Sequence, residues 1–437
     1  MDISAFSGRI RLRDRAGKDI ETPADTSVTV DLDAIAISPK NRSPLRLDFA
    51  DIDEFRVGND VFSFRLCDGV TAELSHLGRR FDEFRHCAGE ALRDYRAKNL
   101  LLEEPVGGES YACQVDAREA NGEAVVKIYA TTLAVLPDIA VPFGVPFGVI
   151  TGVEFDASNY RLVISRRGAE PVVLSQLGRQ TDPFRRLLEE RLSSLRKRHA
   201  DALAFLVPMA SSMVQRCLAD QMPDGVPARK ADIDVIDESL WPALLKAAAG
   251  TAELAAGLNA LIDRSVVDEV AIGVKETNAR QDAEPEDPGE GDAREEIEGA
   301  MVGRVAWFLC PIVASNALAV EATTRAGRAT YFFRIVPADE FRRTKGTEMI
   351  DLARQRVHEV CRALVALSFK REPIYLGDDR ISTGDYARYR LALRVLSYLG
   401  ATRAAFVGRA IHGDNWNAQV DTALKKAEAC REDRGSE

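Results

Sequence analysis

Two stretches of this chain repeat each other at an offset of 100 residues. Residues 73–85 read ELSHLGRRFDEFR, and residues 173–185 read VLSQLGRQTDPFR. Upstream, the same offset matches three more residues with counterparts: Glu54, Phe55 and Asn59 with Glu154, Phe155 and Asn159. Downstream, Arg96 recurs as Arg196. An ungapped series of this length indicates two copies of one structural unit, so a single 100-residue copy must fold as a module.

The first part of each copy has the pattern of short β-strands. In the first copy, runs such as SVTVDL and FRVGNDVFSFRL alternate apolar and polar residues and are broken by Gly, Asp, Asn or Pro. The second copy has YACQVDA, AVVKIYA and RLVISR in the same order. A period of two predicts a meander of about six or seven strands in each copy.

Each copy then changes from a strand pattern to a helix pattern at the sequence LSxLG. The apolar residues that follow are spaced by four, four and three, which makes one stripe on a helix: Phe84, Ala88, Leu92 and Tyr95, then Phe184, Leu188, Leu192 and Leu195. A strand meander closed by one C-terminal helix resembles the pleckstrin-homology (PH-like) superfold. The resemblance lies in the order of elements over roughly residues 5–207, and a superfold of this kind hosts many functions. A split barrel or a sandwich with a terminal helix has the same order.

The sequence as a whole predicts an α+β protein in four parts. We expect a PH-like module at 1–106, a second at 107–207, a helical connector at 208–265 and a third α+β domain at 266–437. In the connector, apolar spacing predicts helices at 208–221 and 239–263. In the last part, strand patterns precede helices that we expect near 346–368, 383–398 and 415–430.

An acidic stretch interrupts the third β unit. Between Arg280 and Glu298 the chain has nine acidic residues against two arginines, so this stretch holds −7 of the formal charge of −10. We expect 276–299 to be a disordered loop. One further prediction is an intramolecular contact between this acidic loop and the basic faces of the two repeat helices.

Composition limits the classes of partner. Outside the acidic stretch the chain is close to neutral, which disfavours a nucleic-acid binder and leaves at most weak peripheral contact with anionic membranes. The seven cysteines are scattered, with no CxxC pair, so neither a disulfide framework nor a zinc site is expected. No stretch approaches 18 uninterrupted apolar residues. We therefore expect a cytoplasmic protein.

The repeated LSxLGR sequence has two interpretations. Its glycine and arginine could offer backbone amides and a guanidinium group to an anion. Alternatively, it is a joint between strand and helix, with leucines in the core and glycine in a conformation that other residues avoid; the joint explains the recurrence more simply. If a binding surface lies here, we expect a protein or peptide partner, with four arginines as anchors: Arg79, Arg85, Arg179 and Arg185. Addition of a strand to a sheet edge is the expected mode.

The most enzyme-like run is FVGRAIHGDNW at 406–416, in which we expect His412 and Asp414 to lie on a loop. In it, His412 could act as a general base and Asp414 could orient it; a helix-capping aspartate beside a surface histidine is the alternative. An enzyme, or a regulatory subunit of one, would have its site around Glu321, Arg334, Arg409, His412 and Asp414. The sequence has no nucleotide, metal or cofactor motif. We therefore expect a non-enzymatic scaffold or adaptor without a cofactor.

Overall fold

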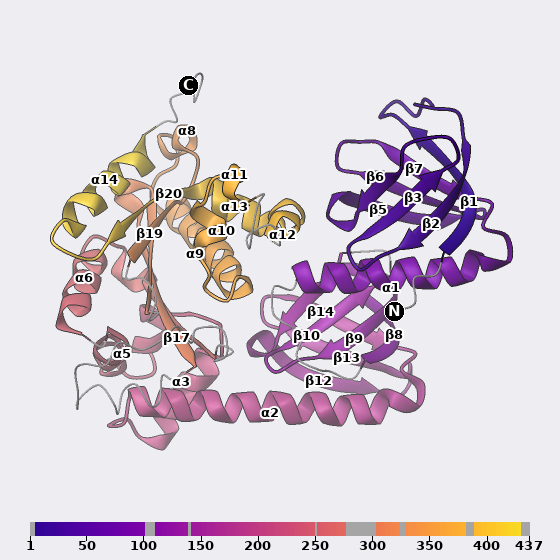
Figure 1. Ribbon diagram of the computed structural model, residues 1–437. Helices are drawn as coiled ribbons and strands as arrows, with labels where there is room; N and C mark the ends of the chain where they lie inside the picture. The colour runs from indigo at the N-terminus through magenta and orange to yellow at the C-terminus, as the bar shows by residue number, and fades with distance from the viewer. Residues whose placement is uncertain are drawn as a thin grey trace, which may run out of the picture. The chain divides into compact units, whose positions relative to one another are not determined.

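The computed structural model describes residues 5–100, 110–138, 141–249, 251–276, 303–323, 329–381 and 389–429. They form an α+β protein with two seven-stranded antiparallel sheets, each followed by a long helix, and then a helical region and a third sheet with helices (Figure 1). The predicted fold class is confirmed. The chain forms two compact units: the first comprises Met1–Val145, Ile150–Arg185 and Ile381–Val395, and the second comprises Pro146–Val149, Arg186–Arg380 and Leu396–Glu437. Among the described helices, none is both long and apolar enough to cross a membrane.

Module 1 is the first sheet together with its helix. The strand order is β4-β3-β2-β1-β7-β6-β5, with β1 (Ala5–Arg13), β2 (Ala24–Val30), β3 (Ala34–Pro39), β4 (Leu45–Asp48), β5 (Ile52–Gly58), β6 (Val61–Leu66) and β7 (Thr71–Ser75). A 3-10 turn, η1 (Phe49–Asp51), joins the two edge strands β4 and β5. The helix α1 (Phe81–Leu100) buries Phe84, Ala88 and Leu92 in the core of this sheet, as the apolar stripe predicted.

Module 2 repeats this topology. Its order is β11-β10-β9-β8-β14-β13-β12, with β8 (Ser110–Ala117), β9 (Ala120–Ile128), β10 (Thr132–Pro137), β11 (Phe143–Pro146), β12 (Ile150–Asp156), β13 (Arg161–Arg166) and β14 (Ala169–Ser175). The 3-10 turn η3 (Phe147–Val149) joins the edge strands, and the helix α2 (Thr181–Leu206) follows. The repeat predicted from the sequence is therefore a repeat of structure.

The offset between the modules is 100 residues in one part of the sheet and 98 in another. Phe62 pairs with Leu74, and Leu162 pairs with Leu174, which keeps the offset of 100. In the neighbouring hairpin, however, Phe55 pairs with Phe64, whereas it is Val153 that pairs with Ile164. The β12–β13 turn is longer by two residues, so the upstream sequence matches at Glu54 and Phe55 are two positions away from their structural counterparts, whereas Asn59 lies in the turn itself. The ungapped alignment is wrong there; an even shift leaves the same faces toward the core.

Helix α1 also packs on module 2, so the two sheets share it (Figure 1). Ala97 lies in a buried cluster with Tyr129, Ala134 and Leu136 of the second module. The guanidinium group of Arg93 donates a hydrogen bond of 2.6 Å to Asp138.

The third sheet has the order β15-β16-β17-β18-β19-β20, with β15 (Ala228–Arg229), β16 (Ala271–Glu276), β17 (Arg304–Ile312), β18 (Ala317–Thr323), β19 (Ala329–Arg334) and β20 (Phe406–Ile411). β17 is buried along almost its whole length, which is typical of a strand covered on both faces. One face packs against α3 (Ser212–Gln221), α5 (Leu240–Ala249), α6 (Ala252–Ile262) and α14 (Trp416–Glu428) in one core. On the other face, Trp307 contacts Phe369, which follows α9 (Thr347–Ala366).

Several boundaries differ from those expected. The helices predicted at 346–368 and 415–430 are confirmed as α9 and α14. The helix predicted at 239–263 is two helices, and the described part of 383–398 forms α12 (Tyr389–Val395) and the start of α13 (Ser397–Ala405). FVGRAI, for which we predicted no strand, is strand β20, and His412 and Asp414 follow it in a loop, as expected. The acidic stretch from Arg280 to Glu298 lies outside the described residues, so the intramolecular contact stays a prediction, as does the four-part domain division.

Candidate functional site

The edge strands of module 1 meet at η1, and helix α12 lies against this turn. We call Ala50, Asp51 and Asp53 the module 1 corner. Arg390 and Arg394 are four residues apart and therefore lie on one face of α12. Arg390 is 3.1 Å from the Asp51 carboxylate, and Arg394 is 3.4 Å from Asp53. Arg394 also donates a hydrogen bond to the Ala50 carbonyl. The corner thus offers three acceptor groups to a pair of guanidinium groups.

A third arginine lies behind this corner. Arg96 of α1 is buried, and its guanidinium group donates a hydrogen bond of 3.3 Å to the Ile52 carbonyl at the start of β5. Burial lowers the pKa of Arg96, and the positive charge of Arg394 lowers it further, while Asp53 opposes the shift. Arg394 therefore binds two aspartates but faces a like charge.

The ion pairs at the module 1 corner are partly exposed. The side chains of Arg390 and Arg394 are 52% and 28% exposed, and those of Asp51 and Asp53 are 31% and 37% exposed. Pairs in such surroundings contribute about 0–1 kcal/mol each. Three apolar residues of α12 are buried: Tyr389, Leu391 and Ala392. The ion pairs thus contribute little stability and mainly fix how α12 lies against this corner.

The same corner of module 2 is built differently. Gly148 is the middle residue of η3, as Ala50 is of η1. A Cβ atom on Gly148 would lie 1.8 Å from the carbonyl oxygen of Asp224. The position equivalent to Asp51 is Val149, so no acidic side chain is present there. This corner is closed by backbone packing against a buried turn.

Of the four arginines proposed as anchors, Arg79 and Arg179 lie in the 3-10 turns between sheet and helix, and Arg85 and Arg185 lie in helices α1 and α2. Arg79, Arg85 and Arg179 are exposed, and Arg185 is partly buried. Each LSxLG sequence runs from a strand into a 3-10 turn, with its leucines buried: Leu74, Leu77, Leu174 and Leu177. Gly78 and Gly178 have φ values of +58° and +57°. The joint interpretation is therefore confirmed, and use of these arginines for binding stays a prediction.

The structure brings together two of the residues named for a catalytic site. Glu321 of β18 is 1% exposed, and His412 Nε2 lies 3.1 Å from its carboxylate. The Thr330 hydroxyl donates to Glu321 (2.6 Å) and accepts from the Trp416 indole (3.0 Å). His412 stacks on Trp416, with 5.4 Å between ring centroids. The result is a buried chain of polar groups that satisfies one carboxylate, which is the requirement for burying it.

The other residues named with His412 lie elsewhere. Asp414 is exposed. Arg334 donates hydrogen bonds to the Lys426, Ala427 and Ala429 carbonyls at the C-terminal end of α14, where a positive charge stabilises a helix. Arg409 lies over the ring of Tyr375, 4.5 Å from its centroid. Arg334 thus caps a helix and Arg409 packs on an aromatic ring. In the described part of the chain, neither arginine converges with His412 and Glu321.

A second buried polar cluster was not predicted from the sequence. Asp224 lies 3.7 Å from both His199 and Lys275, and all three residues are at most 5% exposed. Asp224 also accepts a hydrogen bond of 2.6 Å from the Glu276 amide, and His199 Nε2 lies 2.7 Å from the Met222 carbonyl. Burial lowers the pKa of His199. The three residues come from distant segments with no shared motif, so no local signal could have found them.

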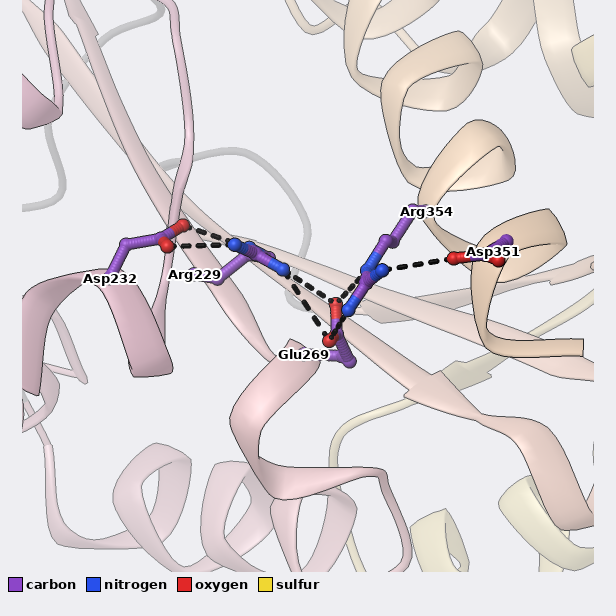
Figure 2. Close-up of polar contacts among 5 residues, drawn as sticks. All are labelled: Arg229, Asp232, Glu269, Asp351 and Arg354. Atoms are coloured by element: carbon purple, nitrogen blue, oxygen red, sulfur yellow. Dashed lines mark hydrogen bonds and ion pairs between the residues drawn. The ribbon is translucent and has the colours of Figure 1, made fainter. Parts of the chain in front are cut away.

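A third network links four elements of the second unit. Figure 2 shows the Glu269 carboxylate between the guanidinium groups of Arg229 and Arg354, each of which also holds an aspartate. Arg354 Nε is 2.8 Å from the carboxylate, and Arg229 is 3.4 Å from it. The hydrogen bond from Arg354 is the main reason that the pKa of Glu269 is lowered. We call these five residues the Glu269 network: Arg229, Asp232, Glu269, Asp351 and Arg354.

Comparison with known proteins adds little. No protein-family model matches the chain, and no curated protein matches it. Among solved structures, the chain is similar to one described as "Structure of the Spt16D Pob3N heterodimer", at 12% identity and a TM-score of 0.16. The match covers 38% of this chain and 84% of that one. A similarity this low carries no argument about function.

Proposed function

We propose that this protein is a non-enzymatic cytoplasmic adaptor that recognises a protein or peptide partner through tandem PH-like modules. The observation that supports the proposal is the module 1 corner, where acidic side chains and a backbone carbonyl receive two arginines of a helix from a distant part of the sequence. A surface that binds a helix of its own chain has the chemistry needed to bind a peptide. The element order of both modules agrees with the PH-like resemblance.

The joint arginines are a second proposed surface. Arg79 and Arg179 are exposed at equivalent positions of the two modules and would suit an acidic partner. The two surfaces have opposite charge, so charge reversal distinguishes them.

Quantitative affinity capture of the full chain from its own cells tests the proposal. We expect a stoichiometric protein partner whose recovery falls at least about tenfold with Asp51→Lys/Asp53→Lys or with Arg79→Glu/Arg179→Glu. The control for the first variant is Asp339→Lys/Asp421→Lys, which makes the same charge change at exposed positions of the other unit. Thermal melts check that each variant is folded. Recovery of a small molecule with no protein partner would overturn the adaptor function.

A further inference from the structure

The module 1 corner and the module 2 corner are the same structural position with different coverings. Helix α12 covers the first through charged side chains that remain partly exposed. The Asp224 turn covers the second through backbone contact with a glycine, at a distance that admits no Cβ atom. A close-packed backbone contact cannot be exchanged for another chain without rearrangement, whereas partly hydrated ion pairs can.

Charge complementarity defines what the module 1 corner binds. Asp51, Asp53 and the Ala50 carbonyl accept from two guanidinium groups that are four residues apart on a helix. A ligand for this site therefore needs arginines at positions i and i+4 of a helix.

We propose that α12 masks the module 1 corner in cis, and that a partner helix with this arginine spacing displaces it. The inference rests on the adaptor function proposed above and names the chemistry of its partner. When a segment of the same chain occupies a site, the apparent affinity for a competitor is the intrinsic affinity multiplied by the fraction of time that the site is free.

The test uses a fluorescein-labelled helical peptide that carries the α12 sequence Tyr389–Val395 between alanine-rich turns. Fluorescence anisotropy measures its binding to the full chain. We expect Arg390→Gln/Arg394→Gln in the chain to raise the affinity about tenfold, since the cis ion pairs are removed. The variant Arg390→Gln/Leu391→Ser/Arg394→Gln also removes a buried apolar side chain of α12 and is expected to raise the affinity further.

Two controls make the result specific. Adding Asp51→Asn/Asp53→Asn to the unmasked chain is expected to lower the affinity about tenfold, and a peptide with both arginines replaced by glutamine is expected to bind at least tenfold more weakly. Equal affinity of the arginine peptide for the wild-type chain and for both unmasked chains would overturn the cis mask. Binding that ignores Asp51→Asn/Asp53→Asn would overturn the site.

The outcomes separate this inference from the adaptor function. A protein partner that is captured equally well with Asp51→Lys/Asp53→Lys leaves the adaptor function standing and places recognition at another surface. If no protein is captured but peptide binding still depends on Asp51 and Asp53, the corner is a docking site for α12 and the adaptor function is wrong.

Discussion

Ala50 and Gly148 are structural counterparts, each the middle residue of the 3-10 turn that joins the two edge strands of its sheet. The Ala50 carbonyl accepts a hydrogen bond from Arg394, and Gly148 lies against the Asp224 carbonyl. Each corner is thus covered by a segment from a later part of the chain. A fold position that is covered in both copies is a natural docking position.

Replacement of Gly148 tests the module 2 corner. A Cβ atom there would lie 1.8 Å from backbone, which cannot move aside as a flexible side chain would. We expect Gly148→Ala to lower the free energy of unfolding by about 1–3 kcal/mol or more, measured by chemical denaturation. Gly152→Ala is the matched control, since its nearest neighbour would be at an ordinary 3.9 Å. Equal stability of the two variants would contradict the close contact.

Replacement of the glycines at the two joints should change stability in the opposite direction from replacement of a glycine inside a helix. Gly78 and Gly178 have positive φ, and nothing would contact an added Cβ atom at either. We expect each change to alanine to reduce stability by about 1 kcal/mol through backbone strain alone. Gly89, inside α1, also has open space but an ordinary helical conformation, so Gly89→Ala should raise stability by about 0.5–1 kcal/mol. Thermal melts of the three variants decide whether conformation or contact matters at the joints.

The buried carboxylate of Glu321 makes stability depend on its polar neighbours. Glu321→Ala removes the acceptor of Thr330 and the ion-pair partner of His412, and it leaves a cavity. We expect a loss of about 2–5 kcal/mol. In a double-mutant cycle with His412→Ala, the two changes should be non-additive by more than about 0.5 kcal/mol. Asp414→Ala is the control, expected within about 0.5 kcal/mol of wild type because this residue is exposed.

The Glu269 network should contribute to the free energy of unfolding in a way that depends on pH. Arg354→Ala removes charged hydrogen bonds to a carboxylate that is 9% exposed, so we expect a loss of about 1–3 kcal/mol near pH 7. The pKa of Glu269 is lowered in the folded protein, so its stabilising effect is complete above the unfolded value of about 4.3 and is lost as pH falls further. The difference between wild type and variant should therefore shrink below pH 4.3. A difference that is constant with pH would exclude this ion pair as its cause; Arg343→Ala, at an exposed pair, is the control.

His199 predicts a loss of stability in mild acid. Burial lowers the pKa of His199 when the chain is folded, so the unfolded chain binds the proton more readily. The free energy of unfolding should decrease as pH falls below about 6.5, the usual histidine value, until the lowered folded pKa is reached. His199→Gln should flatten this dependence between pH 6.5 and 5, and His76→Gln, at an exposed position, should leave it unchanged. Denaturation curves across this pH range measure both slopes.

The sequence by itself determined the modules, because the signals that define them are local. Alternation with a period of two marked the strands, and the stripe that contains Phe84 and Phe184 marked the helices, since burial of one face follows directly from such spacing. The joint at Gly78 and Gly178 was predicted for the same reason. The two-residue shift in the β12–β13 turn was not predicted from the sequence, because an even shift leaves the pattern of buried and exposed positions unchanged.

Only the tertiary structure decided which distant residues meet. Strand β20 was missed because FVGRAI is short and interrupted by glycine, and it is its pairing with β19 that makes it a strand. In the structure His412 pairs with Glu321 and not with Asp414, although Asp414 is only two residues from His412 in the sequence. The contacts of Arg394 with Asp53 and of Gly148 with Asp224 join segments that share no sequence signal. Such contacts form where tertiary packing brings distant segments together. A single sequence contains no local pattern that identifies them.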